Sequence, residues 1–228
     1  MKKTIVSIIC ILALLFLSSC ESGFAKSVRS MLGIDDHDYA SEPVVDTPDR
    51  QSDTIKNLAD TAKILAYSRN IIPFVSFSDA ADGYVDAVLN YLATVYYTKY
   101  SSNKALLQRF SEDYPDLSLS ILIPREDYEN TVYRFFGGSR KAVVKSTAIY
   151  SYLPKTDAFM LVGQVPVSDV SVRVLSAEET ENTYRLSVNF SRDGQNTDVY
   201  DLIFRKRGED DAYIWRVTKS SKVYSIGD

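Results

Sequence analysis

Histidine and cysteine are nearly missing from this chain of 228 residues, which has one histidine and two cysteines. A hydrolase of the Ser-His-Asp type needs a histidine held rigidly beside its nucleophile. The only candidate, His37, lies in a polar stretch rich in aspartate. Zinc sites need several histidine or cysteine ligands. The sequence therefore predicts neither this type of hydrolase nor a metal site.

An excess of basic residues is also absent. Lysine and arginine number 26, against 30 aspartates and glutamates. Nucleic-acid binding requires a basic field, so we predict no nucleic-acid partner. Glycine-rich phosphate loops of the Walker or dinucleotide type are not found either, and no cofactor is predicted.

The first twenty residues have the layout of an export signal. Lys2 and Lys3 precede an apolar run from Thr4 to Phe16, which only Ser7 interrupts. The run is shorter than the roughly 20 residues that span a bilayer. It ends in Leu17-Ser18-Ser19-Cys20. Two simple interpretations of this segment are a secretory signal in which the cysteine occurs by chance and an apolar start that is not cleaved.

This ending resembles the lipobox of bacterial lipoproteins. The resemblance implies that residues 1–19 are removed and that Cys20, now the first residue, carries lipid on its sulfur and its amine. Two or more acyl chains anchor a protein stably, since each buried methylene contributes about 0.8 kcal/mol. The implied location is the bacterial cell envelope, with the domain on the extracytoplasmic side. Glu21, in place of an aspartate, favours the outer membrane if the cell is Gram-negative.

Cleavage leaves 24 basic residues against 30 acidic ones, a net charge of −6. With Cys10 removed and Cys20 lipidated, the mature chain has no free thiol and no disulfide. Cys20 carries the lipid that the resemblance implies, and the composition of the rest of residues 20–51 predicts a flexible tether. Residues 52–228 are predicted to form one domain. Within the tether, Asp35-Asp36-His37-Asp38 is a solvated charge run or, less favoured, a cation site. The spacing of Phe24, Val28, Met31 and Leu32 allows a short amphipathic helix that contacts the membrane, or a plain linker.

Helical spacing begins near Ser52, and Ser78 is the predicted N-cap of a second, much-buried helix. Shorter helices are expected over 104–110 and from Pro124 to Gly137. After Lys141 the period changes to two, which predicts a run of six strands with a hairpin at Asp193-Gly194. The fold class is α+β, with N-terminal helices packed on a curved antiparallel meander.

This order resembles the cystatin-like and NTF2-like cone folds, in which a bent sheet wraps a helix. The stretch from Ile123 through Phe135-Phe136-Gly137 is also similar to modules of uncharacterised bacterial lipoproteins. These resemblances imply a fold that often encloses a pocket, and they do not fix a function.

The chain is predicted to be a non-catalytic module that binds an envelope protein, a glycan or a small ligand. Tyr150 and Tyr152 are candidate ligand contacts, as is the apolar loop 74–77, because tyrosine combines apolar area with a polar tip. Three basic residues near a predicted helix C-terminus form a further candidate site, which would bind an anion: Arg134, Arg140 and Lys141. The alternative is structural, because a helix C-terminus already favours cations.

The alternative function is a cell-wall glycan hydrolase that uses carboxylates alone, which needs two carboxyl groups roughly 5–10 Å apart. Asp201 is the acid of interest, because it interrupts the apolar Val199–Ile203 face of a predicted strand. Inside a conical sheet it would serve as a base or a ligand contact. A position on an edge strand is the favoured interpretation.

Overall fold

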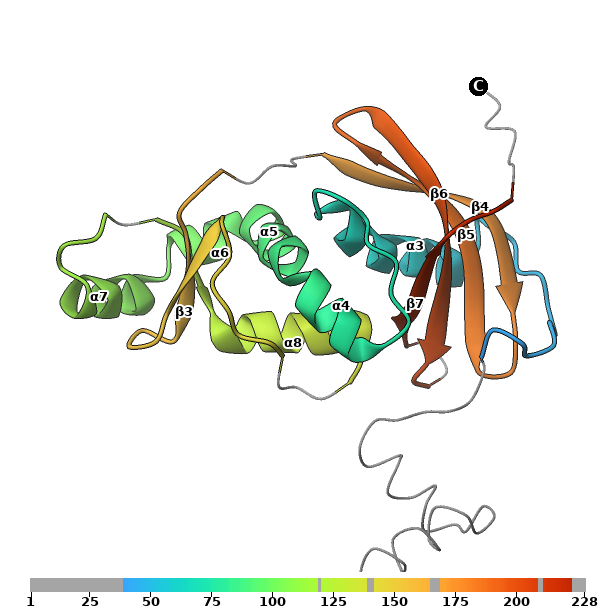
Figure 1. Ribbon diagram of the computed structural model, residues 1–228, viewed down its shortest axis with the longest axis horizontal. Helices are drawn as coiled ribbons and strands as arrows, with labels where there is room; N and C mark the ends of the chain where they lie inside the picture. The colour runs from blue at the N-terminus through green and yellow to red at the C-terminus, as the bar shows by residue number, and fades with distance from the viewer. Residues whose placement is uncertain (1–38, 119, 139–141, 165–168, 209–210, 223–228) are drawn as a thin grey trace, which may run out of the picture. The chain divides into compact units, whose positions relative to one another are not determined.

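The computed structural model describes residues 39–118, 120–138, 142–164, 169–208 and 211–222 (Figure 1). Asp38–Asp228 forms one compact unit of helices and two antiparallel sheets, which confirms the predicted α+β class. The elements, in chain order, are α3 (Asp53–Ala66), α4 (Phe77–Gly83), α5 (Val85–Val95), α6 (Tyr97–Ser101), α7 (Lys104–Asp113), β1 (Leu122–Pro124), α8 (Arg125–Phe136), β2 (Tyr150–Leu153), β3 (Ala158–Leu161), β4 (Val170–Glu179), β5 (Thr183–Arg192), β6 (Gln195–Lys206) and β7 (Ala212–Lys219).

The larger sheet is a four-stranded meander in the order β4-β5-β6-β7. Asp193 and Gly194 connect β5 to β6 with backbone φ angles of 48° and 78°. Two positive φ angles in a two-residue loop fit a type I′ hairpin turn, whose twist matches that of the strands. The hairpin predicted at Asp193-Gly194 is therefore confirmed.

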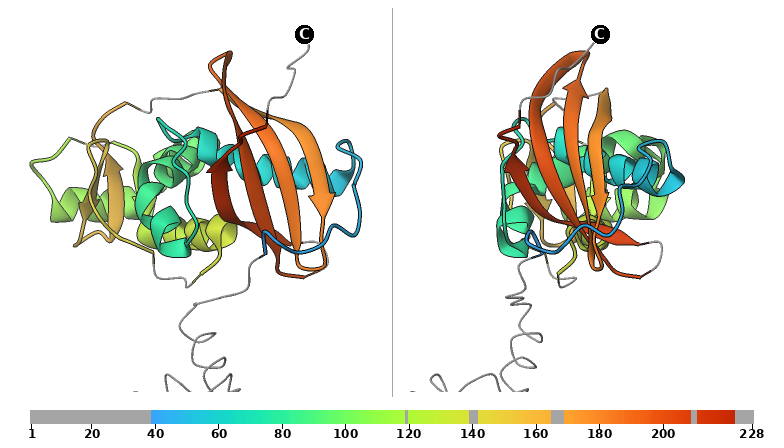
Figure 2. Two further views of the ribbon diagram at one scale, coloured as in Figure 1. Left: turned by 45° about the vertical axis from the view of Figure 1, so that its right-hand side comes forward. Right: turned by 90° about the vertical axis from the view of Figure 1, so that its right-hand side faces the viewer.

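Helix α3 lies across one face of this sheet (Figures 1 and 2). It begins after Ser52, whose side-chain oxygen accepts a hydrogen bond from the Ile55 backbone N–H. Ile55 and Leu65 are fully buried against strand residues such as Val188 and Phe204. The first predicted helix thus packs on the meander as expected, because each element has one apolar face to cover.

The predicted six-stranded run is wrong in its first part. Residues 142–149 contain no strand, and β3 pairs with both β1 and β2 in a separate sheet of order β1-β3-β2. Leu122 pairs with Met160 across 38 residues of chain, a contact that local alternation cannot reveal. Met160 and its neighbours on this side pack against α7 in a second, smaller core.

The single second helix is two helices, α4 and α5, separated at Tyr84. Ser76 caps α4 rather than Ser78, since its side-chain oxygen accepts from the Asp79 backbone N–H at 3.2 Å. The Tyr84 hydroxyl donates to the Ile72 carbonyl and accepts from the Ile72 N–H. This double contact with the preceding loop holds Tyr84 in a non-helical conformation at the junction.

The tether is also shorter than predicted, because residues 39–51 pack on the domain. The Tyr39 ring lies 5.0 Å from the Trp215 ring, and Tyr39 is only 5% exposed. Asp46 forms a backbone bridge with Glu179 at the edge of β4. We call residues 39–51 the N-terminal arm; Figure 2 shows it in blue, crossing the end of the larger sheet. Polar composition suggested a linker, but backbone hydrogen bonds and one aromatic anchor suffice to hold it. The rest of the predicted tether lies outside the described residues.

Candidate functional site

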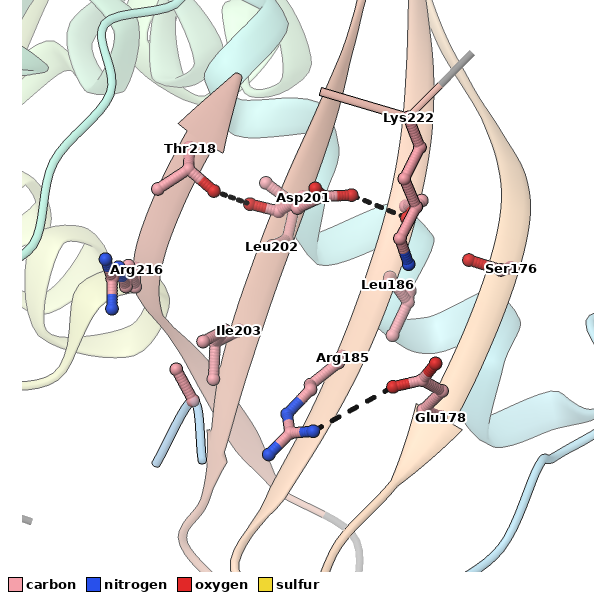
Figure 3. Close-up of a pocket in the computed structure, with 12 residues that line it drawn as sticks. Ser176, Glu178, Arg185, Leu186, Asp201, Leu202, Ile203, Arg216, Thr218 and Lys222 are labelled. Carbon is pink, nitrogen blue, oxygen red and sulfur yellow. Dashed lines mark hydrogen bonds and ion pairs between the residues drawn. The ribbon is translucent and has the colours of Figure 1, made fainter. Parts of the chain in front are cut away.

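The face of the larger sheet opposite α3 carries a groove of about 340 Å³, lined by charged, polar and apolar side chains (Figure 3). Strand register places two rows of side chains across it. The first row, from β4 to β7, is Ser176, Ser187, Asp201 and Thr218. The second row is Glu178, Arg185, Ile203 and Arg216. Ala40 of the N-terminal arm and Lys222 also line the groove.

Asp201 occupies the middle of the first row. Its Oδ1 accepts a hydrogen bond from the Ser187 hydroxyl at 2.6 Å, and its backbone carbonyl accepts from the Thr218 hydroxyl at 3.4 Å. Strand β6 lies between β5 and β7, so the edge-strand interpretation of Asp201 is wrong. The side chain interrupts the apolar pattern because it faces away from the core, into the groove.

Arg185 joins the second row to the N-terminal arm. One terminal nitrogen donates to the backbone carbonyls of Tyr39 at 2.9 Å and Glu42 at 2.6 Å. The other lies 3.9 Å from the Glu178 carboxylate (Figure 3). Much of the hydrogen-bonding capacity of Arg185 is therefore used within the protein, and Glu178 offsets its charge.

Arg216 and Lys222 differ from Arg185 in this respect. Neither side chain makes a hydrogen bond or ion pair with any part of the chain that the structure describes. Arg216 Nε, like Arg185 Nε, is buried without a partner. Three cations and two carboxylates line the groove, which is thus locally positive in a chain of net charge −4. Sequence reasoning missed Arg216. The strand alternation that places Arg216 and Thr218 on one side was the available signal.

The two candidate tyrosines lie on β2 of the smaller sheet and are not brought together with Asp201. Tyr150 has no exposed surface, and its hydroxyl donates to Asn90 Oδ1 at 3.0 Å. Burial raises the pKa of Tyr150. Its prediction as a surface ligand contact is wrong, because the ring fills the core. A buried position for a large aromatic residue is the ordinary outcome.

Tyr152 is partly buried, and its hydroxyl donates to Asp157 Oδ1 at 2.5 Å. Partial burial, together with the Asp157 charge, raises the pKa of Tyr152. Asp157 also contacts the side chain of Arg125 at 3.4 Å. These contacts bind the β2–β3 turn to the start of α8, which gives Tyr152 a structural role. A ligand contact there stays a prediction.

The remaining sequence candidates divide between described and undescribed residues. In the apolar loop, Phe74 is buried and pairs with Val217 of β7, while Val75 is exposed. Arg134 lies at the rim of a second groove of about 390 Å³, between α3, α5 and α8. Other candidates lie outside the described residues: Cys20, residues 35–38, Arg140 and Lys141. Across the described ranges, no group of three or more His, Cys, Asp or Glu side chains is placed to hold a metal ion.

Comparison with known proteins gives no relative. No protein-family model, no curated protein and no solved structure matches this chain. The cystatin-like or NTF2-like cone therefore stays a prediction. Among the described residues, no helix has the length and apolar character needed to cross a bilayer.

Proposed function

We propose that this protein is a bacterial envelope lipoprotein, anchored through lipid on Cys20, whose domain binds a ligand without catalysis. The observation that carries the proposal is the groove on the larger sheet, where Arg216 Nε is buried without a partner among the described residues and the exposed Lys222 adds a second cation. Charged groups that pair with nothing inside a protein are costly unless solvent or a ligand satisfies them. The groove is the proposed ligand site.

The groove is formed by regular secondary structure. Its residues come from four hydrogen-bonded strands, and the N-terminal arm is fastened at one end of it by Arg185. Sites on regular elements hold their side chains more precisely than sites on loops. Eighteen residues separate Cys20 from Tyr39, so even a fully extended chain keeps the domain within roughly 65 Å of the anchor.

The carboxylates of the groove support binding over hydrolysis. Glu178 and Asp201 lie on β4 and β6, with β5 between them, and they belong to different rows. Two strand spacings alone separate their backbones by about 10 Å. A glycosidase needs its two carboxyl groups free to face one substrate bond, whereas Glu178 faces Arg185 and Asp201 accepts from Ser187. The proposed partner in the groove is a glycan, an envelope protein or a small ligand. The proposed location is the extracytoplasmic side of the membrane, which is the outer membrane if the cell is Gram-negative.

Fractionation of cells tests the anchor. We expect Cys20→Ala to leave the membrane pellet after a high-salt wash, because the acyl chains are the stable anchor. The matched control is Cys10→Ala, which leaves the lipobox cysteine in place and should stay in the pellet. A Cys20→Ala protein that still sediments with washed membranes would overturn the proposed anchoring.

A second assay tests the absence of catalysis. The full chain in detergent is incubated with purified cell-wall sacculi, and released reducing ends are counted. We expect none above a heat-denatured control. If the unmodified protein releases reducing ends and Asp201→Asn does not, the protein is a glycan hydrolase and the proposal of a non-catalytic binding module is wrong.

A further inference from the structure

We infer that the groove binds a small zwitterion of the amino-acid class, with its carboxylate at Arg216 and its ammonium at Asp201. The inference rests on the proposed function, in which this groove is the ligand site, and names the chemistry that the groove recognises.

The cationic side of the groove is arranged for a carboxylate. Arg216 presents a planar guanidinium, which bonds carboxylates with two parallel hydrogen bonds when its donors are not already used. Its Nε is buried and unpartnered. Lys222 also lines the groove, and Figure 3 shows it on the other side of Asp201 from Arg216, so it adds positive charge to the groove without sharing the carboxylate.

The anionic side is arranged for an ammonium group. Ser187 donates to Oδ1 of Asp201 and so fixes the carboxylate. Oδ2 of Asp201 accepts from none of the described residues. A carboxylate oxygen facing a groove is an acceptor for a charged N–H donor, and such charge-assisted bonds are roughly twice as strong as neutral ones.

The spacing between these two groups is the main argument. Asp201 is directly opposite Thr218 and therefore diagonal to Arg216, two residues away on β7. Diagonal neighbours across antiparallel strands lie about 7–8 Å apart, within reach of long side chains. Yet no ion pair joins them, although Arg216 Nε has no partner and Asp201 Oδ2 accepts from none of the described residues. Two opposite charges that line one groove without pairing leave a place for a ligand that carries both charges.

Charge also selects against simpler ligands. A dianion such as phosphate would be attracted by Arg216 and repelled by Asp201, and a plain cation would meet the reverse. A zwitterion satisfies both groups at once, so desolvation of each is compensated. The ligand is thus a free amino acid or the amino-carboxylate end of a larger envelope component.

The test is a nuclear magnetic resonance titration of the full, nitrogen-labelled chain in detergent micelles, following the side-chain Nε–H signal of Arg216. The zwitterionic probes are glycine, β-alanine and 4-aminobutyrate, which differ in charge separation. Acetate and phosphate probe the anion alone, and ethylammonium probes the cation alone. We expect at least one zwitterion to shift the signal saturably and to bind at least fivefold more tightly than acetate, phosphate or ethylammonium.

Variants then assign the two ends, with affinity measured by calorimetry. Arg216→Gln and Asp201→Asn should each weaken the zwitterion at least tenfold. Arg216→Lys, which keeps the charge and loses the fork, should weaken it less. Lys56→Gln removes an exposed cation from α3 and serves as the control, with no change expected. Circular dichroism checks that each variant is folded.

Three results would overturn the inference. Phosphate or acetate binding as tightly as every zwitterion would show a plain anion site. Unchanged zwitterion affinity in Asp201→Asn would remove the ammonium contact. No shift with any probe would reject amino-acid chemistry at the groove. In each case the fractionation of Cys20→Ala and the sacculus assay still decide the proposed function separately. Where a zwitterion binds, a soluble cell-wall peptide is then compared with it: tighter binding of the single amino acid points to a free solute, and tighter binding of the peptide points to an envelope component.

Discussion

The hydroxyl of Tyr150 donates a hydrogen bond to Asn90 Oδ1 at 3.0 Å, in a position where neither side chain is exposed to more than 1%. Asn90 in turn donates through Nδ2 to the backbone carbonyl of Tyr67 at 3.0 Å. This chain of bonds connects β2 of the smaller sheet, through α5, to the end of α3 beneath the larger sheet. The smaller sheet and the α3 side of the larger sheet are therefore connected by buried polar groups that all have hydrogen-bond partners, inside one hydrophobic core.

We expect Tyr150→Phe to lower the free energy of unfolding by about 1–2 kcal/mol, because Asn90 Oδ1 is left buried without a donor. Asn90→Ala should cost more, about 2–4 kcal/mol, since it leaves both the Tyr67 carbonyl and the Tyr150 hydroxyl unsatisfied and opens a cavity. Urea unfolding measures both changes. Tyr97→Phe at an exposed ring is the control, with a change within about 0.5 kcal/mol. Additive effects in the double variant would contradict a shared network.

The N-terminal arm gives a second prediction. Tyr39→Ala should lower the free energy of unfolding by about 2–4 kcal/mol, because a buried ring is lost from its place beside Trp215. Trp215 is the single tryptophan of the chain, so its fluorescence reports the arm directly. We expect its emission to shift to longer wavelength in the folded variant. In the unmodified protein, trypsin should cut before residue 39 and spare Arg50, which donates to the Leu175 carbonyl at 3.2 Å. Early cleavage at Arg50 would show that the arm is not packed.

Two glycines should respond differently to the same substitution. Gly137 has a φ of +70°, and an added Cβ would lie 2.5 Å from the Tyr213 ring. Gly137→Ala combines backbone strain of about 1–3 kcal/mol with displacement of that ring. We expect a loss of at least about 2 kcal/mol in urea unfolding. Gly208→Ala, where a Cβ meets nothing within 4 Å and φ is ordinary, should be close to neutral. Equal effects at both positions would contradict the packing of α8 against β7.

Alkaline pH should unfold the protein through its buried tyrosines. Burial, helped by Tyr96, raises the pKa of Tyr91 to about 12, and burial also raises the pKa of Tyr84 and Tyr128. A raised pKa means that the folded state favours the protonated ring. The contribution is therefore complete below about pH 10, where unfolded tyrosine titrates, and is lost as the pH rises through about 12.

Urea unfolding at pH 9, 10, 11 and 12 measures this loss, and absorbance at 295 nm reports ionisation. We expect ionisation and unfolding to occur together. Tyr91→Phe should reduce the fall in stability between pH 10 and 12, whereas Tyr97→Phe should leave the fall unchanged. Full tyrosine ionisation in a still-folded protein would contradict the prediction.

Local signals in the sequence determined much of the fold. Helix α8 begins after Pro124 and ends before Gly137, as predicted. Proline is tolerated at the start of a helix, and glycine accepts the positive φ that often follows the last helical residue. The apolar stripe of α3 and the Asp193-Gly194 turn were equally readable. Each of these features depends on residues within a few positions of one another, where backbone geometry and hydrophobic period act directly.

Tertiary structure decided the rest. The groove exists because β4, β5, β6 and β7 align in one register, and bulges near Val174/Ser176 and Ile203/Phe204 shift that register. A slip of one residue would turn Asp201 and Arg216 to the opposite face. The pairing of Leu122 with Met160 and the docking of Tyr39 on Trp215 likewise join distant segments. Sequence pattern gives which face of a strand is apolar, whereas the partner opposite each residue is fixed only when the whole core packs.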